Sequence, residues 1–152
     1  MVVALDDEVR LTVLHAGCVV VECSNFNDAG VVARLDFGDV SFLLTGDATS
    51  GAENDLVLSA VDVRSTVLKV GHHGSRTSTT QRFLDSVNPA VAIITTGIKN
   101  QFGHPHDEVI ERLVGELGEE AVFVTRDRGT VTVITDGERV WVEVERWDWV
   151  VL

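Results

Sequence analysis

The chain has 152 residues, of which 45% are hydrophobic and 24% are charged, so it holds enough apolar side chains for the core of one globular domain. This composition excludes an intrinsically disordered chain, a fibrous protein and a small disulfide-stapled protein. Acidic residues outnumber basic ones 24 to 12, and the net charge of −12 argues against a general nucleic-acid coat protein. We therefore treat residues 1–152 as a single domain.

The first 45 residues have the β-branched composition and turn spacing of β-strands. We expect strands at residues 9–15, 17–23, 31–37 and 40–44. Gly38-Asp39 forms a hairpin-like turn between the last two. The apolar run 40–44 indicates a central strand that is covered on both faces.

Strands and helices alternate after residue 45. Three helices are expected: residues 50–61, a helix opened by Ser78 and Thr79 and stopped at Asn88-Pro89, and a helix that starts at Pro105. Further strands are expected at 65–70, 91–96, 121–125, 129–135 and 139–146, with a tight hairpin at Asp136-Gly137. The pattern predicts a layered α/β (α+β) fold with a mixed sheet and outer helices.

The cysteines and the termini predict a soluble chain without disulfides. Cys18 and Cys23 lie five apart in an expected strand and point to opposite faces, so they are interpreted as small apolar residues. No apolar run approaches the ~20 residues that span a bilayer, and the N-terminus lacks the pattern of a signal peptide. Trp141, Trp147 and Trp149 are most simply packing aromatics, although three in nine residues also fit a contact surface.

Three segments place polar side chains directly after apolar strands, where layered α/β folds have their sites. The first is Thr45-Gly46-Asp47. Gly46 lets the backbone turn sharply, and the Asp47 carboxylate at the strand end is well placed to hold a metal. The same three residues also fit an ordinary turn.

The second segment is Gly71-His72-His73-Gly74-Ser75-Arg76. Imidazole is the commonest protein ligand for zinc and similar ions, and the flanking glycines free the backbone. Arg76 and the hydroxyls that follow the histidines are candidates for binding an anionic substrate or orienting the imidazole rings. The alternative is a polar loop that leads into a helix cap.

The third segment, residues 100–106, precedes the last helix. His104 is a candidate metal ligand, general acid or base, or donor to a developing negative charge. The alternative is a helix-capping turn whose histidines face solvent. His106 is interpreted as a surface residue, and His15 as a satisfied residue at a strand end.

Taken in order, these segments resemble a known family. Asn27-Asp28, Phe42 to Asp47, Leu68 to Ser75 and Asn100 to Pro105 are similar to the C-terminal hydrolase domain of ComEC-type competence DNA-uptake proteins and to related metallo-β-lactamase-fold hydrolases. The similarity extends over roughly residues 10–145. The resemblance implies two β-sheets packed face to face, with helices outside and metals at the sheet edge.

The resemblance also implies roles for individual residues. Asp47 would bridge two metals, with zinc or manganese as the ions, and His72 or His73 would be a terminal ligand. A metal-bound hydroxide would attack a phosphodiester bond, of DNA or of a smaller substrate, with His104 as proton donor or oxyanion partner. Ser75, Arg76 and Asn100 would contact the substrate.

One departure from the family concerns its first metal motif. The sequence has no His-x-His-x-Asp-His, His15 has no partner at that spacing, and the other four histidines lie beyond residue 70. In addition, Gly30 stands where the family pattern leads us to expect a serine. We therefore expect the C-terminal half of the sandwich, whose apolar inner face would be covered by a missing N-terminal half or by self-association. The competing hypotheses are a non-catalytic fold remnant that serves as a binding or assembly module, and a single-metal protein that uses the His72-His73 loop.

Overall fold

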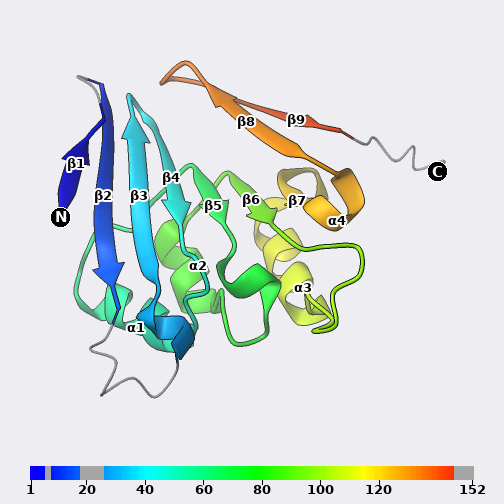
Figure 1. Ribbon diagram of the computed structural model, residues 1–152. Helices are drawn as coiled ribbons and strands as arrows, with labels where there is room; N and C mark the ends of the chain where they lie inside the picture. Colours follow the sequence, from blue (N-terminus) through cyan, green and yellow to red (C-terminus); the bar gives the residue numbers. More distant parts are fainter. Residues whose placement is uncertain (6–7, 18–25, 146–152) are drawn as a thin grey trace.

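A seven-stranded mixed sheet organises the computed structural model, which describes residues 1–5, 8–17 and 26–145 (Figure 1). The strands lie side by side in chain order: β1 (Val2–Ala4), β2 (Val9–Ala16), β3 (Val31–Phe37), β4 (Val40–Leu44), β5 (Val67–Lys69), β6 (Val91–Ile94) and β7 (Val122–Val124). Strands β1 to β4 pair antiparallel, and β4 to β7 pair parallel. The predicted mixed sheet is confirmed, with β4 as an interior strand. The strand expected at residues 17–23 lies outside the described residues apart from Gly17, and so do both cysteines.

A separate hairpin follows the sheet. It consists of β8 (Val131–Thr135) and β9 (Val140–Val144), joined by the predicted turn at Asp136-Gly137. The hairpin runs back to the turn between β3 and β4, where the Asp39 N–H donates to the Gly137 carbonyl at 2.6 Å (Figure 1). A Cβ on Gly38 would lie 2.5 Å from that carbonyl oxygen, so this contact requires glycine.

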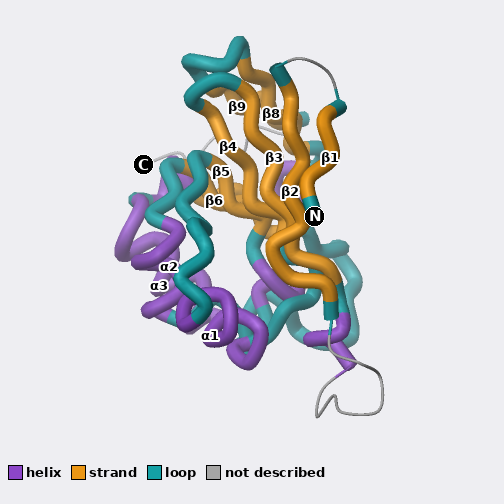
Figure 2. The backbone as a smooth tube through the Cα atoms, turned by 90° about the vertical axis from the view of Figure 1, so that its left-hand side faces the viewer, coloured by secondary structure: helices purple, strands orange, loops and turns teal. Residues whose placement is uncertain are grey.

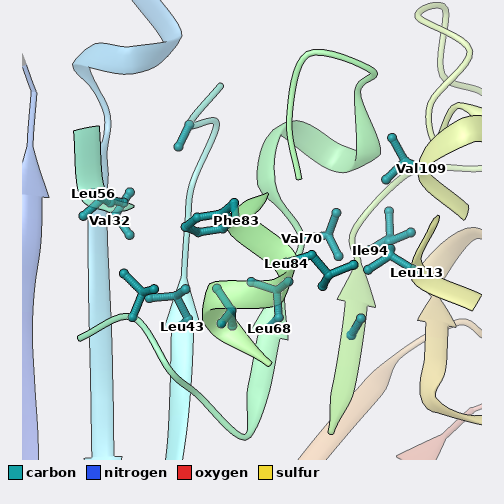
Figure 3. Close-up of a cluster of buried hydrophobic side chains, with 14 of the residues drawn as sticks. Val32, Leu43, Leu56, Leu68, Val70, Phe83, Leu84, Ile94, Val109 and Leu113 are labelled. Carbon is teal, nitrogen blue, oxygen red and sulfur yellow. The ribbon is translucent and has the colours of Figure 1, made fainter. Parts of the chain in front are cut away.

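Helices cover one face of the large sheet (Figure 2). They are α1 (Ser50–Leu58), α2 (Gln81–Val87) and α3 (Asp107–Leu117), and α4 (Thr125–Arg128) follows β7 as a single turn. Three short 3-10 segments complete the described elements: η1 (Phe26–Ala29), η2 (Gly71–Gly74) and η3 (Glu119–Ala121). The core lies between helices and sheet and includes Val32, Leu43, Leu56, Leu68, Phe83, Leu84, Ile94, Val109 and Leu113 (Figure 3).

Several helix boundaries differ from the predictions. α1 ends at Leu58 rather than at residue 61, and α4 was not expected. The cap of α2 is Thr80, whose hydroxyl accepts the Phe83 N–H, because Ser78 instead donates its hydroxyl to the Gly71 and Ser75 carbonyls. The helix ends at Asn88, as the sequence indicated, and Asn88 adopts a left-handed conformation.

The last helix also starts later than the sequence predicted. α3 begins at Asp107, with His106 at the N-cap, so Pro105 precedes the helix instead of opening it. Asp107 and Glu108 lie in the first turn, where their charges complement the helix dipole.

The other face of the sheet is largely apolar, and no helix of residues 1–5, 8–17 and 26–145 forms a layer over it (Figure 2). Residues paired across β3 and β4 point to the same side, which puts Leu35 beside Phe42 and Ala33 beside Leu44, away from the core-facing Leu43. Leu44 is 43% exposed, and Val31 on the same face of β3 is 54% exposed. Strand β4 is therefore interior to the sheet, and it is covered on both faces at Val40, which is 2% exposed, but not at Leu44. Within the described residues, the one other sheet is the β8–β9 hairpin.

In residues 1–5, 8–17 and 26–145, no helix is both long and apolar enough to cross a bilayer.

Candidate active site

The three polar segments lie at one edge of the sheet. Strands β4, β5 and β6 are parallel, so the loops that follow them leave from the same edge. Two bonds join the first two loops: the His72 N–H donates to the Gly46 carbonyl at 3.1 Å, and the Thr45 hydroxyl donates to the Lys69 carbonyl at 2.6 Å. Each of the three segments lies in the loop that follows its strand, as the sequence predicted, and the fold brings them to the same edge of the sheet.

Asp47 and His73 face each other in this cluster. Nε2 of His73 lies 3.4 Å from Oδ1 of Asp47, and both side chains are about half exposed. Nδ1 of His73 lies 2.6 Å from the Thr95 carbonyl oxygen, which can only accept, so the ring hydrogen is on Nδ1. In the neutral ring Nε2 then carries a lone pair directed at a carboxylate. Such a pair of facing acceptors requires a proton or a cation between them.

The backbone of the histidine loop is strained. His72 and His73 both adopt left-handed conformations, with φ of 45° and 54°, and Gly74 continues with φ of 78°. Non-glycine residues in this region cost of order 1–3 kcal/mol each and cluster at functional sites. Gly74 itself is required by packing, because a Cβ there would lie 2.6 Å from Cβ of Pro105.

Four rings form a contiguous cluster beside this pair. His104 makes an edge contact with His72 at 5.5 Å between centroids, and another with His106 at 5.0 Å. Phe102 stacks on His104 at 5.9 Å with 27° between the planes. Burial, together with the neighbouring imidazoles, lowers the pKa of His104, which favours its neutral form.

His106 has a structural role that its interpretation as a surface residue missed. Its Nδ1 accepts the N–H of Arg76 at 3.1 Å, and its own N–H donates to the Gly74 carbonyl at 3.0 Å. These two bonds fasten the start of α3 to the histidine loop. The sequence signal for this role was the position of His106 immediately before the helix, where capping residues are found.

The predicted substrate-binding residues lie around the cluster in different environments. Ser75 is buried, and its hydroxyl lies 3.0 Å from that of Thr77. Arg76 is exposed and forms an ion pair with Glu108. The Asn100 amide donates to the His104 carbonyl at 2.7 Å and accepts the His104 N–H at 2.8 Å, so it fixes the loop that carries His104. The assignment of all three to substrate binding stays a prediction.

Lys69, the last residue of β5, lies near Asp47. The Lys69 Nζ donates to the Val70 carbonyl at 2.9 Å. Burial lowers its pKa, and the opposing influence is the nearby negative charge of Asp47. Lys69 is therefore a cationic neighbour of the carboxylate.

Two carboxylates outside the cluster hold its loops in place. Asp28 accepts from the backbone N–H of Thr49, at the start of α1. Glu53, which is 1% exposed, accepts the backbone N–H groups of Thr79 and Thr80 and lies near Arg112. Neither role could be predicted from the sequence, because the partners of both carboxylates lie more than 20 residues away.

The donor set fits part of a metal site. Asp47 and His73 offer a carboxylate oxygen and an imidazole nitrogen to one point, and the His73 Nδ1–Thr95 bond is the kind of support that orients a ligating imidazole. In the part of the chain that the structure describes, no group of three or more His, Cys, Asp or Glu side chains is arranged to hold a metal ion. A four-coordinate site would need further ligands.

A cavity of about 460 Å³ opens next to the pair. Its lining residues come from the ends of β6 and β7, the histidine loop and the loop before α3: His73, Thr95, Thr96, Gly97, Asn100, Phe102, His104 and Thr125. The cavity therefore connects His73 with the ring of Phe102.

We compared the chain with protein families and with known proteins. No family model matches it. It is 37% identical over 87 residues to ComE operon protein 3 of Bacillus subtilis and 45% identical over 87 residues to Recombination protein 2 of Haemophilus influenzae, in each case 57% of this chain and 11% of the relative. It is also 37% identical over 95 residues to Competence protein ComA of Neisseria gonorrhoeae, which is 60% of this chain and 14% of that protein.

Of these three relatives, one is named a competence protein and one is named for the ComE operon. Their names support a competence-related family and agree with the family resemblance seen in the sequence. The chain spans only 11 to 14% of the length of these three relatives.

Proposed function

We propose that this chain provides part of the metal centre of a phosphodiester hydrolase in a competence-related system, with Asp47 and His73 as ligands of a divalent cation. The observation that carries the proposal is the 3.4 Å approach of His73 Nε2 to Asp47 Oδ1, with the ring hydrogen directed at Thr95. A cation between the two would satisfy both acceptors. Carboxylate and imidazole together suit zinc or manganese.

The neighbouring residues support hydrolysis. A bound divalent cation lowers the pKa of a water ligand and polarises a phosphoryl oxygen. His104, whose pKa is lowered, is a neutral imidazole at neutral pH and provides a ring N–H for the charge that develops on the phosphate or leaving group. His72, in edge contact with His104, is the alternative ligand.

DNA is the substrate that the family resemblance favours. The net charge of −12 opposes the approach of a polyanion. The bound cation offsets this repulsion locally, together with Lys69, Lys99 and the exposed Arg76. Smaller phosphodiesters carry fewer negative charges than DNA, so the acidic chain repels them less, and the same residues would act on them.

The remaining ligands have to come from outside the described pair. The metallo-β-lactamase-like arrangement that the sequence suggests places a second sheet opposite the apolar face on which Val31 and Leu44 are exposed. A covering half, supplied by an N-terminal segment or by a second copy, would complete both the hydrophobic packing and the ligand set.

Hydrolysis of a chromogenic phosphodiester tests the proposal, measured with manganese, with zinc and with a chelator. We expect slow turnover that needs the metal, is lost in Asp47→Asn and is retained in Asp55→Asn, a matched change on the exposed side of α1. Turnover that survives the chelator or Asp47→Asn would contradict it.

A non-catalytic assembly module is the second candidate function, favoured by the exposed apolar side chains of Val31 and Leu44. It predicts no metal-dependent turnover at any protein concentration, together with association through that face.

A further inference from the structure

We propose that the cavity between His73 and Phe102 binds one unpaired nucleobase of the substrate, with the ring of Phe102 as its stacking surface. The inference rests on the proposed function for the position of the phosphodiester, next to Asp47 and His73. In addition to the proposed function, we infer that Phe102 determines specificity and that single-stranded substrate is preferred over double-stranded substrate.

Phe102 is a large apolar side chain in a polar loop. Its side chain is 68% exposed, yet its ring is not unsupported, because it stacks on His104. His104 is in turn held by the two bonds between its backbone and Asn100. The result is an aromatic surface that is fixed from behind and open in front, as base-stacking platforms are.

The cavity is large enough for a nucleobase and extends from His73 to Phe102. Its volume of about 460 Å³ lies within the range of small-molecule sites. His73 lines one part of it and Phe102 another, so a phosphodiester beside His73 would place an attached base within reach of the aromatic ring.

The side chains of Thr96, Asn100 and Thr125 in the cavity wall already have partners within the fold. The Thr125 hydroxyl donates to the Thr96 carbonyl, the Thr96 hydroxyl donates to the His104 carbonyl, and the Asn100 amide donates to that same carbonyl. These groups are therefore committed to the loop rather than to reading the edge of a base. Stacking of this kind tolerates every base, because each has a π-face.

Stacking within a duplex would block this mode of binding. A base inside a duplex is covered on both faces by its neighbours, and unstacking it costs free energy that a single-stranded base does not require. Lys99, exposed in the same loop, adds a positive charge for the adjoining backbone phosphates.

Fluorescence anisotropy with three labelled probes of equal length tests the inference: single-stranded oligothymidine, an abasic oligomer and a duplex. All titrations contain a chelator, so the outcome does not depend on metal binding or on hydrolysis. We expect the base-bearing single strand to bind more tightly than the other two. Phe102→Ala should weaken its binding about 5- to 150-fold, the effect of losing one base–aromatic stack.

Two further variants separate stacking from loss of structure. Phe102→Trp keeps an aromatic face and should retain binding. Ile98→Ala removes a side chain that is 66% exposed in the same loop but does not line the cavity, and it should bind as the parent chain does. Equal affinity for base-bearing and abasic probes, an equal effect of Phe102→Ala and Ile98→Ala, or no binding of any probe would overturn the inference. Failure of metal-dependent hydrolysis alone would leave the result of this titration intact.

Discussion

Thr49 donates both its backbone N–H and its hydroxyl to the carboxylate of Asp28, at 2.8 and 2.7 Å, across 21 positions of sequence. Thr49 is the N-cap of α1, and its own hydroxyl makes no cap bond to the helix. Asp28 therefore ties the connection between β2 and β3 to the loop that follows Asp47. This contact gives a structural role to Asp28, which lies in the Asn27-Asp28 segment whose function the sequence left open.

Asp28→Asn should weaken this tie. Asparagine keeps one acceptor oxygen but loses the negative charge, and hydrogen bonds to charged groups are the stronger ones. We expect the free energy of unfolding to fall by about 1–2 kcal/mol in urea titrations. Asp55→Asn, on the exposed side of α1, should change it by less than about 0.5 kcal/mol. Equal effects of the two substitutions would show that the Asp28 contact contributes nothing.

Glu53 gives the chain a pH-dependent stability. Burial raises the pKa of Glu53 above its usual value of 4.5, although the N–H groups of Thr79 and Thr80 and the charge of Arg112 oppose that rise. Below pH 4.5 the group is protonated whether the chain is folded or not. As the pH rises above 4.5, Glu53 ionises in the unfolded chain before it ionises in the folded chain. The contribution of Glu53 to the free energy of unfolding therefore falls between pH 4.5 and the higher pKa that Glu53 has in the folded chain.

Glu53→Gln removes that titration. Between pH 4.5 and neutrality, the variant should therefore gain stability relative to the parent, by about 1.4 kcal/mol for each unit by which folding raises the pKa. Urea unfolding at a series of pH values measures the difference. Glu111→Gln, an exposed change on α3, should show no such trend. A constant difference between Glu53→Gln and the parent across this range would rule out the effect.

The strands, and the positions of the polar loops directly after them, could be predicted from the sequence because they follow local rules. Residues 31–37 and 40–44 were predicted to the residue, since alternation and a Gly-Asp turn define that hairpin. The polar loops meet because successive parallel strands deliver them to one edge.

What the sequence could not supply depends on long-range contacts. The helix cap at Thr80 and the left-handed Thr79 follow from Glu53, which binds their N–H groups from α1. The hydrogen bonds from Asn100 to His104 and from Arg76 to His106 likewise form only when the loops are folded together. The choice of His73 rather than His72 as the partner of Asp47 depends on the backbone turn between them.

The apolar face of the sheet should drive self-association of the chain when it is studied alone. Val31 and Leu44 are exposed on that face, whereas Leu58 is more exposed, at 69%, but lies at the end of α1. We expect the average mass in sedimentation equilibrium to rise with concentration, and the double variant Val31→Thr, Leu44→Thr to suppress the rise. Leu58→Thr should behave as the parent does. A chain that stays monomeric at all concentrations, or an equal effect of Leu58→Thr, would count against a role for this face.

Metal binding tests the central claim most directly, because Asp47 and His73 are proposed to share one cation. Elemental analysis after dialysis against trace zinc and manganese, followed by calorimetric titration, gives the stoichiometry. We predict weak binding of about one equivalent per chain, with solvent completing the coordination that Asp47 and His73 begin, lost in both Asp47→Asn and His73→Gln and retained in Asp55→Asn. A chain that binds no metal, or that retains its full metal content in either site variant, would contradict the account.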